Sequence, residues 1–322
     1  VFLALGLNIV VGFAGLLDLG YIAFYAVGAY VYALLASPHF GIHLPFWVIL
    51  PIGAAVACLF GAMLGAPTLK LRGDYLAIVT LGFGEIVRIF MNNLSQPVNI
   101  TNGPQGITLI DPFRIGGMSF RDADTFLGLT FTGPIKYYYF LLVILLVVIV
   151  INLRLQDSRI GRAWEAIRED EIAARAMGIN TRNMKLLAFA MGASFGGIAG
   201  GMFSAMQGFI SPESFVLVES VMVLSMVVLG GMGNIFGVIL GAILLTMFPE
   251  ALRYIGDLQD YLFGRVVVDA ADLRMLLFGL ALVLIMIFRP AGLLPSVRRR
   301  QEFGADAAVL AQEQASLYDT RR

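Results

Sequence analysis

A charged segment, residues 157–185, carries the side chains best placed to do chemistry. It reads DSRIGRAWEAIREDEIAARAMGINTRNMK and lies between two strongly apolar runs. Basic and acidic side chains alternate along it, so it can form salt bridges on its own surface or bind a charged partner. Trp164 and Ile167 recur at helical spacing, which predicts an amphipathic helix over 163–177 with Gly178 as its C-terminal cap. An ordinary charged loop is the alternative interpretation.

Motifs for catalysis or metal binding do not occur in this chain. The lysines are Lys70, Lys136 and Lys185, and none follows a glycine, so there is no GxxxxGK[ST] phosphate loop. His39 and His43 have no carboxylate ligand nearby, so we expect no metal site. A single cysteine inside an apolar run excludes a disulfide framework. We therefore expect a chain that is not an enzyme and holds no cofactor.

Composition places the chain in a membrane. Hydrophobic residues make up 59% of it and charged residues 14%, whereas soluble domains average about 45–50% apolar and about 25% charged residues. The formal net charge of +0 provides no global basic field that would favour nucleic acid. The expected fold class is an all-α integral membrane protein.

Apolar runs that approach the length of a membrane span, about 20 residues, recur along the chain and predict a polytopic helical bundle. Roughly nine spans are expected by this criterion, at 1–17, 19–36, 46–68, 75–92, 137–153, 186–206, 215–231, 235–252 and 275–288. Because the chain begins inside an apolar run, we expect at least one more span upstream. The predicted transmembrane domain covers 1–295, with polar loops at 93–136 and 253–274, and a basic-then-polar tail follows at 296–322.

Basic residues predict the orientation, since short cytoplasmic loops are enriched in lysine and arginine. One set of alternate loops holds Lys70, Arg72, the charged segment and the arginines that follow residue 288. The other set, which includes 93–136 and 253–274, has fewer basic residues, largely matched by aspartate. The charged segment and the C-terminal tail are therefore predicted to be cytoplasmic, and the two long loops periplasmic.

Polar and glycine residues inside the apolar runs are candidates for a translocation path. Glu85 and Arg88 are three apart, so they share a helix face and can pair. Charges within a membrane usually face the interior of the bundle, although a pair that only fixes helix packing is an equal alternative. Asn8 can hydrogen-bond a ligand or a neighbouring helix. The stretch 228–237, VVLGGMGNIF, predicts a tight turn or a helix break. It supplies the remaining candidates, Gly230, Gly231, Gly233 and Asn234.

Four long stretches carry a resemblance to a known family. They are GLNIVVGFAGLLDLGYIAFYAVGAY, LKLRGDYLAIVTLGFGEIVRI, GRAWEAIREDEIAARAMGINTRNMKLLAFAMGASFGGIAGG and VLGGMGNIFGVILGAILL. Over nearly all of 1–295 the chain resembles the longer of the two permease subunits of bacterial branched-chain amino-acid ABC importers. The resemblance implies a type II-like fold in the inner membrane. It also implies a second permease as partner, two ABC ATPase subunits that bind ATP and Mg, and a periplasmic substrate-binding protein.

The resemblance also gives the charged segment a role. ABC permeases present a cytoplasmic coupling helix to the ATPase, often with an EAA-x-x-x-G pattern. In the aligned run, 172–178, Ile172 replaces the expected glutamate and Glu171 lies one place earlier. The implied ATPase-coupling residues are Arg162, Trp164, Glu165, Ile167, Arg168, Glu171, Ala173, Ala174 and Gly178.

The expected function is ATP-driven import of leucine, isoleucine and valine through this chain and its partner permease. Three alternatives remain open from the sequence. A permease of the same family would carry urea, short amides or other small solutes. An ion-coupled secondary transporter would use Glu85 or Asp18 as its ion site and leave the charged segment unexplained. A passive channel is compatible with the many glycines.

Overall fold

The computed structural model describes residues 1–68, 71, 73–115, 118–126, 129–263, 279–280, 283, 287 and 292–294. The chain forms two compact units, Val1–Leu224 and Ser225–Arg322. Most of the expected ninth span at 275–288, part of the loop at 253–274, the domain boundary at 295 and the whole tail at 296–322 lie outside the described residues. Lys70 and Arg72 lie outside them as well.

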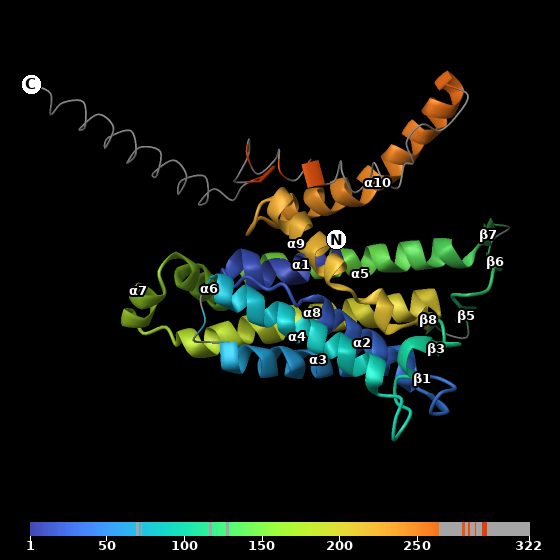
Figure 1. Ribbon diagram of the computed structural model, residues 1–322, viewed down its shortest axis with the longest axis horizontal. Helices are drawn as coiled ribbons and strands as arrows, with labels where there is room; N and C mark the ends of the chain where they lie inside the picture. The colour runs from blue at the N-terminus through green and yellow to red at the C-terminus, as the bar shows by residue number, and fades with distance from the viewer. Residues whose placement is uncertain are drawn as a thin grey trace, which may run out of the picture. The chain divides into compact units, whose positions relative to one another are not determined.

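Helices dominate the described residues of both units (Figure 1). They are α1 Phe2–Leu7, the π-helix η1 Asn8–Phe13, α2 Ile22–Leu35, α3 Phe46–Thr68, α4 Asp74–Asn93, α5 Gly133–Gln156, α6 Arg159–Glu169, α7 Glu171–Ala176, α8 Thr181–Gln207, α9 Leu217–Gly230 and α10 Ile235–Phe263. Four described segments are long and apolar enough to cross a membrane, namely Phe46–Thr68, Gly133–Gln156, Thr181–Gln207 and Pro212–Gly230. Shorter apolar helices are Phe2–Phe13, Ile22–Leu35 and Ile235–Phe248. The helical, multi-pass class expected from composition is confirmed.

Short antiparallel strand pairs, which the all-α expectation did not include, lie at one end of the helices of the first unit, and α6 and α7 lie at the other end (Figure 1). The pairs are β1 Ala36–Ser37 with β2 Ile42–His43, β3 Ile107–Thr108 with β8 Phe209–Ile210, β4 Arg114–Ile115 with β5 Met118–Ser119, and β6 Asp124–Phe126 with β7 Leu129–Phe131. Two 3-10 turns, η2 Gly103–Gln105 and η3 Pro212–Ser214, complete this end. The β3–β8 pair, with Ile107 opposite Ile210, joins the long loop after α4 to the residues that follow α8.

Glycine allows the three central helices of the first unit to approach closely. α8 packs against both α2 and α3. At the crossing, a Cβ atom added to Gly28 of α2 would lie 2.1 Å from the carbonyl oxygen of Gly197 in α8. A Cβ atom on Gly197 would in turn lie 2.7 Å from the carbonyl oxygen of Gly53 in α3. Small residues are the usual means of helix association in lipid, because they bring backbones into van der Waals contact.

The first expected span, 1–17, is wrong in its bounds. Its helix changes to the π form at Asn8 and ends at Phe13, and α2 begins only at Ile22. The intervening backbone is held by side chains: Asp18 Oδ1 accepts a hydrogen bond from Gly20 N at 2.8 Å, and Thr80 Oγ1 accepts one from Leu19 N at 3.0 Å. Aspartate and threonine oxygens satisfy N–H groups that would otherwise need a continuous helix.

In the second unit, the glycine-rich stretch forms the turn that its sequence predicts. α9 ends at Gly230 and α10 begins at Ile235. Gly231 and Gly233 adopt φ values of +114° and +85°, a left-handed region that residues with a Cβ atom rarely enter. Asn234 Oδ1 accepts a hydrogen bond from Gly237 N at 3.2 Å and so caps the start of α10.

Candidate functional site

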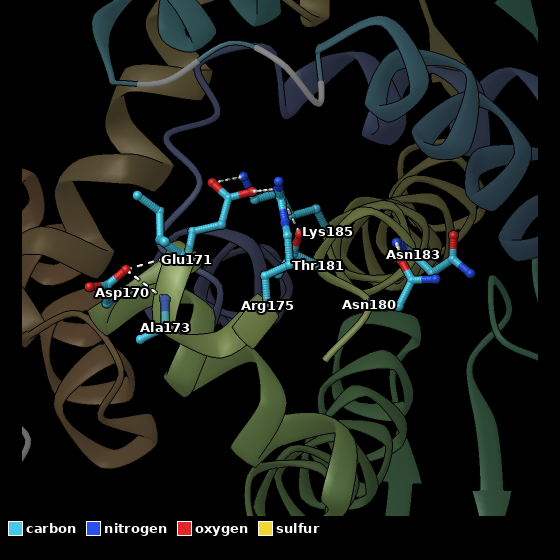
Figure 2. A network of polar contacts seen from close by, with 9 residues as sticks. Asp170, Glu171, Ala173, Arg175, Asn180, Thr181, Asn183 and Lys185 are labelled. Atoms are coloured by element: carbon cyan, nitrogen blue, oxygen red, sulfur yellow. Dashed lines mark hydrogen bonds and ion pairs between the residues drawn. The ribbon is translucent and has the colours of Figure 1, made fainter. Parts of the chain in front are cut away.

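The charged segment folds as two helices, so the expectation of one helix over 163–177 is wrong. Ser158 caps α6 by accepting a hydrogen bond from Gly161 N at 3.1 Å. At Asp170 the backbone is extended, and its Oδ1 atom accepts hydrogen bonds from Ile172 N at 2.7 Å and Ala173 N at 3.0 Å (Figure 2). Aspartate is a strong N-cap because its carboxylate satisfies N–H groups of the first turn. Asp170 therefore ends α6 and begins α7.

The apolar side of α6 attaches this pair of helices, which we call the α6–α7 bracket, to α8. Trp164 is 0% exposed and Ile167 is 5% exposed. The Trp164 Nε1 atom donates a hydrogen bond to the Met184 carbonyl oxygen at 2.7 Å. A buried tryptophan normally finds a partner for its N–H in this way. The amphipathic pattern expected from the sequence is confirmed for α6.

Arg168 attaches the bracket to the first helical segment of the chain. Its Nη1 atom donates a hydrogen bond to the carbonyl oxygen of Gly12, near the end of η1. A cation is favourable at a helix C-terminus, where carbonyl oxygens have no partner within the helix. This contact joins residues that are far apart in the sequence.

Ion pairs connect α7 to the start of α8. The Glu171 carboxylate lies 2.8 Å from Lys185 Nζ through Oε2 and 3.2 Å from Arg175 Nη2 through Oε1. Arg175 Nη2 also donates to Thr181 Oγ1 at 3.3 Å, and these side chains converge between the two helices (Figure 2). The Lys185 side chain is only 7% exposed. Because a buried charge is costly unless it is compensated, removing Glu171 would leave Lys185 poorly stabilised.

The outer side of α7 exposes apolar side chains. Ile172 is 71% exposed and Met177 is 83% exposed. Gly178 ends α7 with φ +87°, and its N–H bonds to the Arg175 carbonyl oxygen at 3.0 Å, so the expected glycine cap is confirmed. Sequence reasoning did not include Ile172 or Met177 among the site residues. Their signal was a pair of large apolar side chains beside the charged residues of the run EDEIAARAM.

The nine expected coupling residues differ in where the structure places them. Trp164, Ile167, Arg168, Glu171 and Ala174 face the rest of the first unit. Arg162, Ala173 and Gly178 are exposed, and Glu165 is half-buried. Their part in ATPase coupling stays a prediction.

The expected pair between Glu85 and Arg88 is confirmed. Arg88 Nε donates to Glu85 Oε2 at 3.1 Å. Arg88 also lies 3.4 Å from Glu213 Oε1 through its Nη1 atom, and Asn92 Nδ2 donates to the same oxygen at 3.4 Å. Glu213 belongs to η3, so this cluster joins the C-terminal half of α4 to the loop at the strand-bearing end.

The other expected path residues have structural positions of their own. Asn8 is fully buried in the π-helix. Gly230, Gly231, Gly233 and Asn234 form the turn between α9 and α10 in the second unit. A Cβ atom on Gly230 would lie 2.2 Å from the carbonyl oxygen of Gly237, so close packing accounts for this glycine. Among the described residues, no group of three or more His, Cys, Asp and Glu side chains is placed to hold a metal ion.

Long apolar helices joined by an amphipathic bracket define a multi-pass membrane protein. Residues 1–286 match the family model described as the permease component of the branched-chain amino acid transport system. The chain therefore belongs to this family.

Individual relatives agree with the family assignment. The chain is 48% identical over 321 residues to the high-affinity branched-chain amino acid transport system permease protein LivM of Escherichia coli (strain K12), which covers 96% of this chain and 70% of that protein. It is 28% identical over 272 residues to the probable LivM permease of Methanocaldococcus jannaschii, covering 84% and 74% of the two chains. It is 24% identical over 298 residues to LivH of Escherichia coli (strain K12), covering 91% and 90%. No solved structure matches the chain.

Proposed function

We propose that the chain is a permease subunit of an ATP-driven ABC importer that carries leucine, isoleucine and valine across the bacterial inner membrane. The names of its relatives support the substrate class. The observation that carries the proposal is the α6–α7 bracket, an exposed helical element placed directly between two helices long enough to span a membrane. Because the sequence has no phosphate loop of its own, energy would reach it from outside.

The bracket is built to transmit a displacement. Only Asp157 and Ser158 separate α5 from α6, and Trp164 and Glu171 fasten the bracket to α8. Arg168 adds a contact to η1. A partner that moves the bracket would therefore move α5, α8 and η1 together. ATP binding would change the transport state only by favouring one arrangement of these helices over the other.

The proposed assembly contains a second permease, two ABC ATPase subunits and a periplasmic substrate-binding protein. The bracket and the C-terminal tail would lie in the cytoplasm, and the strand-bearing end would face the binding protein. ATP and Mg would be held by the ATPases, and this chain would hold no cofactor. A type II-like fold with roughly nine or more spans would complete the membrane domain. The proposed path residues are Asn8, Glu85, Arg88, Gly230, Gly231, Gly233 and Asn234.

Exposure assigns different tasks to the coupling residues. Ile172 and Met177, together with exposed Arg162, Ala173 and Gly178, would contact the ATPase, because exposed apolar side chains gain most when a partner buries them. Buried Trp164, Ile167 and Ala174 would position the bracket, and half-buried Arg168 and Glu171 would do so through their polar contacts. Half-buried Glu165 lies between the two groups.

The decisive experiment is transport in proteoliposomes that contain this chain, the partner permease, the ATPases and the binding protein, with radiolabelled leucine. Accumulation that requires both ATP and the binding protein is expected. Uptake driven by an ion gradient without ATP would contradict the proposal and direct attention to Glu85 and Asp18. ATPase activity that does not depend on leucine, together with no leucine uptake, would support an ABC importer whose substrate is urea, an amide or another small solute.

The contact surface has its own test. Ile172→Ser is expected to weaken association with the ATPase about tenfold, because a residue central to an interface contributes about 1–2 kcal/mol or more. Leu109→Ser is the matched control, since Leu109 is 66% exposed at the strand-bearing end. Equal ATPase affinity of the two variants would show that Ile172 lies outside the interface.

A further inference from the structure

A pocket of about 570 Å³ opens between the end of α3 and the start of α8, beside α7. Ala66 and Pro67 form its apolar wall, and polar side chains of α7 and α8 form the remainder. Of its lining residues, only Glu171 is among the expected coupling residues. The pocket lies where α3 and α8 reach the bracket end of the first unit.

The polar wall carries an excess of positive charge. Its charged side chains are Arg175, Arg182, Lys185 and Glu171. Glu171 bridges Arg175 and Lys185. Arg182 is exposed and has no ion-pair partner among the described residues. Lys185 is already paired with Glu171, so the excess charge that would attract a further anion comes from the three cations that share one carboxylate.

An apolar stripe on α3 leads to this pocket. Leu59 is 59% exposed and Met63 is 60% exposed, and Ala66 and Pro67 follow at a spacing of three or four residues. Residues at this spacing lie on one side of a helix. A ligand that combined an anionic head with an apolar tail would fit both the basic wall and the stripe. A small inorganic anion would use only the wall.

We propose that this pocket binds the phosphate headgroup of an anionic phospholipid from the leaflet at the bracket end of the protein. The planar guanidinium group of Arg182 would bind two phosphate oxygens, with Arg175 and Lys185 adding charge. Basic pockets between transmembrane helices are established sites for such headgroups. The acyl chains would lie along Leu59 and Met63. The bound lipid would then bridge α3, α7 and α8 next to the bracket.

Native mass spectrometry of the full chain, purified with the proteins that accompany it, tests this site directly. After exchange into detergent with phosphatidylglycerol, the native chain is expected to retain this lipid, and Arg182→Gln is expected to retain several-fold less. Arg154→Gln is the matched control, because Arg154 is an exposed arginine at the same end, in the last turn of α5, and does not line the pocket. Thermal unfolding checks that both variants remain folded.

Three outcomes would overturn the proposal. Equal loss of lipid in the two variants would mean that net charge, not the pocket, holds it. Equal retention of phosphatidylcholine would remove the role of the basic wall. Inorganic phosphate in excess distinguishes a lipid headgroup from a free anion as the ligand: a lipid that stays bound supports the lipid site. Displacement of the lipid by free phosphate would assign a site for small anions instead.

Discussion

The two ends of the first unit are held together by different physical means. At the bracket end, the buried Trp164 and Ile167 side chains are supplemented by single polar contacts. These contacts join Trp164 to Met184, Arg168 to Gly12 and Glu171 to Lys185. Each of these contacts joins a helix to a helix or to a helix end. A displacement of the bracket would therefore act directly on the helices that it touches.

The strand-bearing end is stabilised chiefly by packing of aromatic rings. Phe113, at the centre, lies 3.9 Å from Phe46 and 5.2 Å from Tyr137 between ring centroids, and Phe120 and Phe140 complete the cluster. These rings come from α3, from the loop before α5 and from α5 itself. Aromatic packing is less directional than a hydrogen bond. The bracket end thus carries the contacts that the proposed coupling requires, whereas the strand-bearing end packs its loops over an aromatic core.

Removal of the main bracket anchor should have the largest effect. Trp164→Ala is expected to lower the free energy of unfolding by about 3–5 kcal/mol, because it empties a fully buried site and deletes the bond to Met184. ATP-dependent uptake should fall with it. Thermal unfolding and transport measure the two effects. Trp47→Ala is the control, since Trp47 is 57% exposed, and a similar loss in both variants would contradict the anchor.

A smaller effect is expected from one hydroxyl group at the strand-bearing end. Tyr137→Phe removes the donor to the Ala205 carbonyl oxygen at 3.0 Å and the acceptor for Phe113 N at 3.3 Å. We expect a loss of about 1–3 kcal/mol in the free energy of unfolding, because buried polar groups are left without their partner. Tyr139→Phe, at a side chain 58% exposed, should be near neutral. Chemical denaturation compares the two variants, and equal stability would refute the role of this hydroxyl.

The smallest effect should come from the ion pair between α4 and η3. Glu213→Gln removes a partner of Arg88, but the Glu213 side chain is 61% exposed and the distance is 3.4 Å. We expect a change below about 1 kcal/mol in the free energy of unfolding. The difference from the native chain should shrink further at high salt, which screens exposed charges. A loss of unfolding free energy that is large and independent of salt would contradict this expectation and show that the ion pair is a main stabilising contact.

Local patterns predicted several elements closely. α3 begins at Phe46 and ends at Thr68, as expected, because its apolar run is continuous and follows a proline. The pair between Glu85 and Arg88 followed from a spacing of three residues on a helix. The cap at Gly178 followed from the freedom of glycine to adopt positive φ. In each case the deciding interaction lies within a few residues of the chain.

Other features could not be predicted, because distant residues decide them. The first helix ends at Phe13, and the backbone after it is held by Thr80. The break at Asp170 is local, since its side chain caps the next two N–H groups it reaches, but helical periodicity alone favoured one continuous helix. The basic pocket beside α7 requires α3 and α8 to meet at one end, and their lining residues are far apart in the sequence.

The class of the protein, its family, most of its helices and the segment that forms the bracket follow from the sequence. Composition, apolar length and helical period are local quantities, so they can be read without knowledge of packing. Which bracket side chains are buried depends on the tertiary structure, which covers Trp164 completely and leaves Ile172 exposed. The reason is physical: burial depends on which helix lies opposite, and that neighbour is set by close packing between distant parts of the chain.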